Sequence, residues 1–193
     1  NPPVVIFSAA RRVRDNTTKD TLHNAMQQKE VVINVVNYAI TQQVNLSSAE
    51  YSSDVDEFVK SGLTPIASDL VAPRRVKESP VSLECEVRDV LHMGEEGGAG
   101  NLVMCVVKRM HIADDVLLED GGIDQDAIDL VVRMGKAWWV RASRDALFEL
   151  APPKLGICVN QIPDFIRHST NLTGNNLCQL GAKITLPTTE EVE

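Results

Sequence analysis

The sequence lacks the features that mark several common classes of protein. No apolar run approaches the ~20 residues that a membrane-spanning helix needs. The formal net charge is −8, and this acidic balance argues against nucleic acid or an anionic membrane surface as a partner, because both attract clustered Lys and Arg. We therefore expect a protein that binds neither nucleic acid nor membrane.

The cysteines form no recognisable motif. Cys85, Cys105, Cys158 and Cys178 show neither Cys-x-x-Cys spacing nor a histidine at zinc-finger distance. The first two lie in apolar strand-like segments, where a free thiol behaves as a small hydrophobic side chain. We expect four reduced, redox-silent cysteines and no metal site, as in a cytoplasmic protein.

Catalytic motifs are also missing. The sequence contains no Gly-x-Ser-x-Gly, no His-Glu-x-x-His and no Walker-type loop. The glycine-rich Gly94–Gly100 joins two strand-like segments and lacks dinucleotide-binding spacing. The four histidines are scattered, which is typical of packed or surface side chains. His111 ends a strand-like segment, which could place it at the mouth of a barrel. No catalytic residue is assigned.

The sequence does contain a basic turn between two strand-like segments. Four cations, Arg11, Arg12, Arg14 and Lys19, fall within nine residues of an otherwise acidic chain. A helix is expected to begin directly after them, and its first turn would present unpaired N–H groups and the positive end of the helix dipole. The combination predicts a phosphate-binding turn. A solvated loop whose charges bind nothing is the alternative.

Hydrophobic periodicity predicts strands interrupted by short helices. Val31–Val36 is nearly all apolar and predicts a strand buried on both faces. Pro80–Leu91 alternates, which places Ser82 and Glu84 on the polar face. Antiparallel hairpins with helical insertions indicate a small β-barrel rather than a βαβ sheet. The expected strands are Pro3–Ser8, Val31–Val36, Pro80–Leu91, Asn101–Ile112 and Lys136–Ala142, and the expected helices are Asp20–Gln28, Tyr38–Leu46, Val55–Ser61 and a short one in Asp124–Asp129.

Six segments match, in order, the motifs of a known family. They are Pro2–Ser8, Lys19-Asp20-Thr21 with Asn24, Val31–Val35, Asp56–Phe58 with Gly62–Thr64, Ser79-Pro80 with Glu84-Cys85, and the tail from Ile162-Pro163 through Thr173-Gly174-Asn175 to Leu177. The set resembles the flavin reductase-like FMN-binding split-barrel family, in particular its flavoredoxin-like branch. The resemblance covers nearly the whole chain.

This resemblance implies a mainly β protein with short helices, built as a six-stranded Greek-key split β-barrel over residues 1–153. The family has further strands before the first segment seen here, and they end in a loop that contacts the isoalloxazine ring. Residues 154–193 would form a C-terminal extension that packs on the barrel or on a dimer partner. The resemblance also implies a homodimer with FMN held non-covalently near the interface. We expect Ile162–Leu180, in two short helical pieces, to join the dimer contact.

The same resemblance assigns the phosphate of FMN to the basic turn. Asp20 is anionic, so we expect its carboxylate to cap the helix and only its backbone N–H to face the phosphate. Asn24 would brace the turn or reach the flavin. The implied cofactor-binding residues are Ser8, Arg11, Arg12, Lys19, Asp20, Thr21 and Asn24.

Three functions are compatible with these observations. The first is a flavin-dependent oxidoreductase that transfers electrons through FMN. The second is a flavoredoxin-like electron-transfer protein that serves a redox partner protein and has no NAD(P)H turnover of its own. The third is a redox-inactive flavin-binding module. NADH-dependent members of the family carry Gly-Asp-His where this chain has Gly98-Ala99-Gly100, so NADH or NADPH stays an open choice of electron donor. We expect the first function.

Overall fold

The computed structural model describes residues 1–150 and 156–185. Contacts divide the chain into two units, Asn1–Leu147 and Phe148–Glu193. The predicted boundary between residues 153 and 154 lies outside the described residues, so the proposed domain limits stay a prediction. None of the described helices has the length and apolar character that crossing a bilayer requires.

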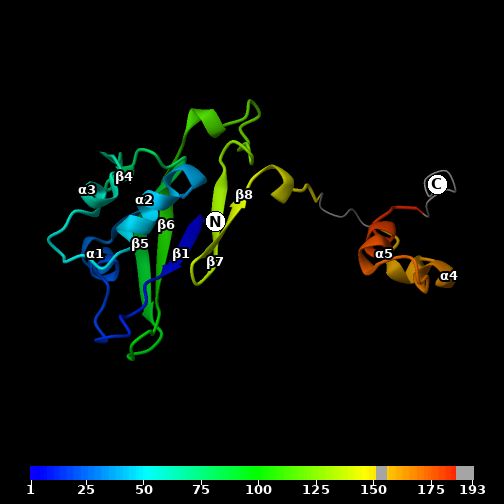
Figure 1. Ribbon diagram of the computed structural model, residues 1–193, viewed down its shortest axis with the longest axis horizontal. Coiled ribbons are helices and arrows are strands. Elements are labelled where there is room, and N and C mark those ends of the chain that lie inside the picture. The colour runs from blue at the N-terminus through cyan, green and yellow to red at the C-terminus, as the bar shows by residue number, and fades with distance from the viewer. Residues whose placement is uncertain (151–155, 186–193) are drawn as a thin grey trace. The chain divides into compact units, whose positions relative to one another are not determined.

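A four-stranded antiparallel sheet forms the centre of the first unit, in the order β1-β6-β5-β2. The two long central strands pair as the predicted hairpin (Figure 1). His92 lies opposite Asn101 where the hairpin turns. Register shifts at two points of this pair mark bulges, which bend a sheet and increase its twist. The four strands are β1 (Val4–Ser8), β2 (Glu30–Asn34), β5 (Val81–His92) and β6 (Asn101–Ile112).

The main core lies between this sheet and helix α1 (Asp20–Gln28). Leu22 and Ala25 are buried and lie one helical turn apart, so α1 presents an apolar stripe to the strands. They pack in one cluster with Cys85, Val103 and Cys105. Burying a leucine fully contributes about 1.5–3 kcal/mol. The apolar stripe therefore holds α1, and the basic turn before it, against the sheet.

Short elements complete the first unit. Helix α3 begins where the Asp56 carboxylate accepts a hydrogen bond from the Phe58 amide at 2.9 Å, and it ends at Gly62 with φ +72°, as predicted. The remaining elements are η1 (Tyr38–Ile40), α2 (Thr41–Ser47), α3 (Glu57–Ser61), β3 (Pro65–Ile66), β4 (Arg75–Val76), η2 (Asp114–Val116), β7 (Leu130–Gly135), β8 (Trp138–Ala142) and η3 (Arg144–Ala146). Strands β3 and β4 form one hairpin and β7 and β8 another.

The second unit contains η4 (Val159–Gln161), α4 (Asp164–Arg167) and α5 (Gly174–Gly181). The two short helical pieces expected in Ile162–Leu180 are therefore present. Thr173 begins α5 in a reciprocal cap with Asn176, in which each side chain accepts a hydrogen bond from the other residue's backbone N–H.

Two expectations about the fold are wrong. Strand β2 is an edge strand with half-buried side chains, so it is not covered on both faces. Residues 124–129 form a turn rather than a helix, because the Asp124 carboxylate accepts hydrogen bonds from the Asp126 and Ala127 amides. The described strands form an open sheet and two hairpins, and no barrel closes among them, so the six-stranded Greek-key arrangement stays a prediction. Strands β3, β4 and β7 were not predicted at all.

Candidate functional site

The basic turn is folded by its own arginines. Arg11 donates from Nε to Asn16 Oδ1 at 2.6 Å and from a terminal nitrogen to the Asn16 carbonyl at 2.5 Å. Arg12 donates to the Thr17 hydroxyl at 3.2 Å and to the Thr18 carbonyl at 2.5 Å. Two of the four cations therefore hold the loop in shape.

The N-cap of helix α1 lies one residue earlier than expected. Lys19 is the N-cap, with extended backbone angles and no side-chain capping bond, and Asp20 is the first helical residue. The prediction that Asp20 caps the helix is therefore wrong. Its carboxylate instead pairs with Arg12 at 3.6 Å. At this position a carboxylate still stabilises the positive end of the helix dipole.

Five of the seven predicted site residues line one hollow of about 310 Å³, which we call the turn hollow. Ser8 and Arg11 do not line it. Ser8 ends β1 and pairs with Leu102, while Arg11 is turned toward Asn16. The five are Arg12, Lys19, Asp20, Thr21 and Asn24, and the opposite wall comes from the end of α2 and the segment after it.

One cation of the turn hollow stays available for an anion. Carboxylates of Asp20, Glu50 and Glu57 also line the hollow, and the first two are paired with Arg12 and with Arg14 respectively. The Lys19 ammonium, by contrast, has no hydrogen-bond or ion-pair partner within the described part of the chain. Thr21 and the first amides of α1 lie beside it, and they provide neutral donors.

A larger hollow of about 840 Å³ adjoins the first; we call it the sheet hollow. Thr21, Asn24 and Glu57 line both hollows. The sheet hollow also has walls from Val5–Phe7 of β1 and Val31–Ile33 of β2, the two edge strands of the sheet. The sheet is therefore curled enough for its opposite edges to face one cavity.

The two hollows together suit a ligand with unlike ends. The turn hollow offers an unpaired ammonium, a hydroxyl and helix amides, which are donors for a phosphate. The sheet hollow has the volume of a small-molecule site and apolar walls from both edge strands, as a planar ring system requires. An amphipathic molecule with a phosphate at one end and an aromatic system at the other matches this arrangement. The residues present therefore fit FMN.

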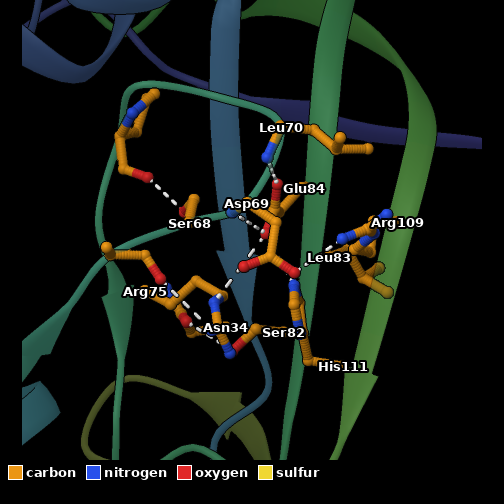
Figure 2. Close-up of polar contacts among 12 residues, drawn as sticks. Asn34, Ser68, Asp69, Leu70, Arg75, Ser82, Leu83, Glu84, Arg109 and His111 are labelled. Carbon is orange, nitrogen blue, oxygen red and sulfur yellow. Dashed lines mark hydrogen bonds and ion pairs between the residues drawn. The ribbon is translucent and has the colours of Figure 1, made fainter.

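A second polar cluster, around Glu84 of β5, was not recognised from the sequence. Glu84 is 0% exposed, although strand alternation placed it on the polar face. Figure 2 shows the loop after β3 crossing over this side chain, and the amides of Asp69 and Leu70 donate to its two oxygens at 2.9 and 2.6 Å. His111 of β6 lies 2.6 Å from the same carboxylate. Ser82, two residues before Glu84, is buried as well and bonds to Asn34.

Hydrogen bonding decides the ionisation of Glu84. Burial alone would raise its pKa, but the amides of Asp69 and Leu70 together with His111 outweigh that effect and lower the pKa from 4.5 to about 2. The carboxylate is therefore ionised at neutral pH and holds the loop on the sheet.

The side chains of Asp69, Glu84 and His111 lie close enough together to hold a cation. Both carboxylates already have partners in the protein, however. Both oxygens of Glu84 accept backbone amides, and Asp69 pairs with Arg109 at 2.6 Å. Arg75 Nε lies 3.8 Å from Glu84 and adds a second positive charge. The cluster is thus a network in which His111 takes part, and the buried Arg75 Nε is its one atom without a hydrogen-bond partner among the described residues.

The cysteines fall into two groups. Cys85 and Cys105 are fully buried, and burial raises the pKa of both thiols, that of Cys85 to about 11. A thiol with a raised pKa is a poor nucleophile at neutral pH. Cys158 and Cys178 are exposed in the second unit.

Comparison with known proteins identifies the family. Residues 1–126 match the family model described as the flavin reductase like domain. An uncharacterized protein of Halalkalibacterium halodurans is 36% identical over 135 residues, which are 69% of this chain and 64% of the relative. The chain therefore spans slightly less than two thirds of that relative's length.

Two solved structures share the fold and about a quarter of the sequence. Nitrilotriacetate monooxygenase component B from Bacillus cereus is 26% identical, with a TM-score of 0.71 over 78% of this chain and 73% of that one. A protein assigned as a flavin reductase with a split barrel domain, from Shewanella frigidimarina, is 28% identical, with a TM-score of 0.64 over 78% and 72%. Together with the family-model match over residues 1–126, these likenesses show that the chain belongs to the flavin reductase-like domain family and has its split-barrel type of fold.

Proposed function

We propose that this protein is an FMN-binding oxidoreductase of the flavin reductase type. The observation that carries the proposal is the pair of adjoining hollows, one with an unpaired ammonium and one with apolar walls. Family membership supports a flavin-related redox function. Bound FMN would supply the electron-carrying chemistry, while the protein positions it and limits its contact with water.

Individual residues have distinct roles in this proposal. Lys19 and Thr21 hold the phosphate, with the first amides of α1 as further donors. Arg12 keeps the turn closed and neutralises Asp20, whose carboxylate would otherwise repel the phosphate. Asn24 lines both hollows and therefore lies where phosphate and ring system would join. Ser8 and Arg11 stay proposed contacts that rest on the family resemblance alone.

A second candidate is an electron-transfer protein that carries FMN but does not oxidise NAD(P)H. Gly98-Ala99-Gly100 at the end of the β5–β6 hairpin favours it, because NADH-dependent members resembling this chain have a histidine there. Flavin absorbance and NAD(P)H oxidation, measured on one preparation, separate the candidates. Flavin with turnover supports the oxidoreductase, and flavin without turnover supports the electron-transfer protein. No flavin would contradict both and leave a binding module that has the fold without redox activity.

The assembly and its setting belong to the same proposal. We infer a cytoplasmic homodimer that closes the flavin site, in which the segment Ile162–Leu180 contributes to the contact, and a redox partner protein if the second candidate holds. Support comes from the open sheet, whose edge strand β1 carries exposed apolar side chains, and from the reduced state that four unpaired cysteines indicate.

The phosphate contact is tested by Lys19→Ala. We expect this variant to bind FMN about tenfold to a hundredfold more weakly and riboflavin with nearly unchanged affinity, because riboflavin lacks the phosphate and a charge-assisted hydrogen bond contributes about 1.5–3 kcal/mol. Fluorescence titration of both flavins measures the two affinities. Lys60→Ala, on exposed α3 and outside both hollows, is the matched control. Equal losses for both flavins would remove Lys19 from the phosphate.

A further inference from the structure

A third hollow lies apart from the turn hollow and the sheet hollow. Helix α2 and the preceding η1 form one side of it, and the hairpin β7–β8 forms the other. Its volume is about 660 Å³. We call it the hairpin hollow; its defining residues are Tyr38, Asn45, Arg133, Lys136, Trp139 and Arg141. It meets α2 along Thr41–Asn45, whereas the turn hollow meets that helix at Ser47, and no residue lines both hollows. The two sites are therefore separate.

The charge of the hairpin hollow is unlike that of the chain as a whole. Its lining contains three cations and no carboxylate, in a protein of net charge −8. Arg141 is neutralised by Asp129, which accepts from it at 2.7 and 2.8 Å. Arg133 donates to the backbone carbonyl of Lys136 at 3.1 Å, and within the described residues neither of these two side chains has an acidic partner. Two positive charges are left to attract an anion.

Aromatic rings supply the second feature. The guanidinium of Arg141 lies 4.0 Å from the centre of the Tyr38 ring, and that of Arg133 lies 5.5 Å from the Trp139 ring. Trp139 is half-buried at the hollow, while Trp138, on the opposite face of β8, is 75% exposed. Rings and flat guanidinium groups in this combination stack well against a planar aromatic ligand.

From the joint presence of aromatic rings and unneutralised cations, we propose that the hairpin hollow binds a nucleotide. Its base stacks at Trp139 or Tyr38, and its phosphates are held by Arg133 and Lys136. Thr41, Gln42 and Asn45 line the same space and offer hydroxyl and amide groups to the sugar or the base edge. The volume lies within the range of small-molecule sites. This site is independent of the proposed flavin site.

Calorimetric titration with ADP tests the proposal. Adenosine lacks the phosphates and inorganic pyrophosphate lacks the base, so we expect ADP to bind at least about tenfold more tightly than either. Pyrophosphate that binds as tightly as ADP would show a site for phosphate alone, and adenosine that binds as tightly as ADP would show that the cations play no part. Absence of saturable ADP binding up to millimolar concentration also overturns the proposal.

Paired variants locate the bound nucleotide. Arg133→Gln with Lys136→Asn removes both free charges and should weaken ADP about tenfold or more. Asn is chosen because Lys136 has φ +49°, a left-handed conformation that Asn adopts more readily than most residues. Lys19→Ala is the matched control in the turn hollow and should leave ADP affinity unchanged. Weaker ADP binding in Lys19→Ala, with unchanged binding in the double variant, would place ADP in the flavin site and contradict the proposal.

Tryptophan fluorescence gives a reading that does not depend on affinity. In Trp138→Phe the sole tryptophan is Trp139, since the sequence contains two. A base stacked on Trp139 or on Tyr38 should change the emission of Trp139 when ADP is added. The change in emission should saturate at the same ADP concentrations as the calorimetric curve. An unchanged emission at saturating ADP would exclude the hairpin hollow as the binding site.

Discussion

The carboxylate of Glu84 is an ionised group with no exposure to solvent, and its partners are mostly backbone amides. A charge in such a position is stable only while every bond to it is made. Those amides belong to Asp69 and Leu70, in the loop between β3 and β4. The side chain therefore fixes a loop that has little apolar packing of its own, and losing the charge should release it.

Glu84→Gln should reduce the free energy of unfolding by about 2–4 kcal/mol. The neutral amide loses charge-assisted bonds and turns its own N–H₂ toward a backbone N–H donor. Urea denaturation measures the change. The control is Glu86→Gln, two residues further along β5, where the side chain is exposed and pairs with Lys108 at 3.1 Å. That exposed pair contributes up to about 1 kcal/mol, so equal effects of the two changes would contradict a structural role for Glu84.

Glu84 also predicts how stability changes in acid. Its pKa is lowered from 4.5 to about 2 in the folded protein, so the folded state binds its proton less readily than the unfolded chain does. The stabilisation is complete above pH 4.5 and is lost as pH falls from 4.5 to 2. Unfolding free energies of the native protein and Glu84→Gln should therefore converge across this window. A constant difference between them would show that Glu84 is not the titrating group.

Local and distant residues of the candidate site differed in how well they could be predicted. Arg12, Lys19 and Thr21 lie within ten positions, so a turn and the start of a helix suffice to bring them together. The apolar walls of the sheet hollow come from β1 and β2, which meet only because the whole sheet curls. The burial of Glu84 also depends on a distant segment. The loop between β3 and β4 covers it, and the alternation of the strand does not show that this loop lies there.

Among the elements, those with a strong repeating pattern were predicted and those that depend on distant partners were not. β5 and β6 alternate over twelve residues each around a glycine-rich turn, which predicts a hairpin. β3 and β4 contain two residues each. Such short pairs have almost no pattern of their own and form where the loop is already held, here by Glu84.

The second unit depends on a close approach between two glycines. A Cβ atom on Gly156 would lie 2.6 Å from the Gly181 carbonyl oxygen, at the end of α5. The approach permits the Cys158 amide to donate to that same carbonyl at 2.9 Å. Only a residue without a side chain fits at position 156, so this contact should be sensitive to the smallest possible substitution.

Gly156→Ala should therefore destabilise the second unit, by roughly 1–3 kcal/mol because an added methyl forces the backbone apart. Gly174→Ala is the matched control. A Cβ there meets nothing within 4 Å, and alanine at the start of α5 is neutral or slightly stabilising. Hydrogen exchange at the Cys158 amide measures the difference, with faster exchange expected only in Gly156→Ala. Unchanged exchange would mean that the segment around position 156 shifts to make room for the methyl group without a loss of stability.

At the scale of the whole molecule, each unit exposes large apolar side chains. In the first unit Val4 and Ile6 on edge strand β1 are 46% and 61% exposed, and Trp138 and Val140 on β8 are 75% and 43% exposed. In the second unit Phe165 of α4 is 79% exposed. Soluble proteins seldom leave several large apolar side chains uncovered on one element or edge without a partner. These side chains support the proposed homodimer, because an isologous contact covers the same patch on both copies.

Removal of the residues after Pro153 tests the part of this proposal that concerns the second unit. If Ile162–Leu180 contributes to the dimer, light scattering should show a shift toward monomer at micromolar concentration, and FMN affinity should fall with it. Phe165→Ser is the gentler variant, since it removes one exposed apolar side chain and leaves the capped helix α5 intact. It should weaken the dimer in the same direction, because burying a phenylalanine contributes about 1.5–3 kcal/mol per copy. Native dimer affinity and native FMN binding in both variants would exclude this segment from the interface and leave the exposed edge of the first unit as the contact.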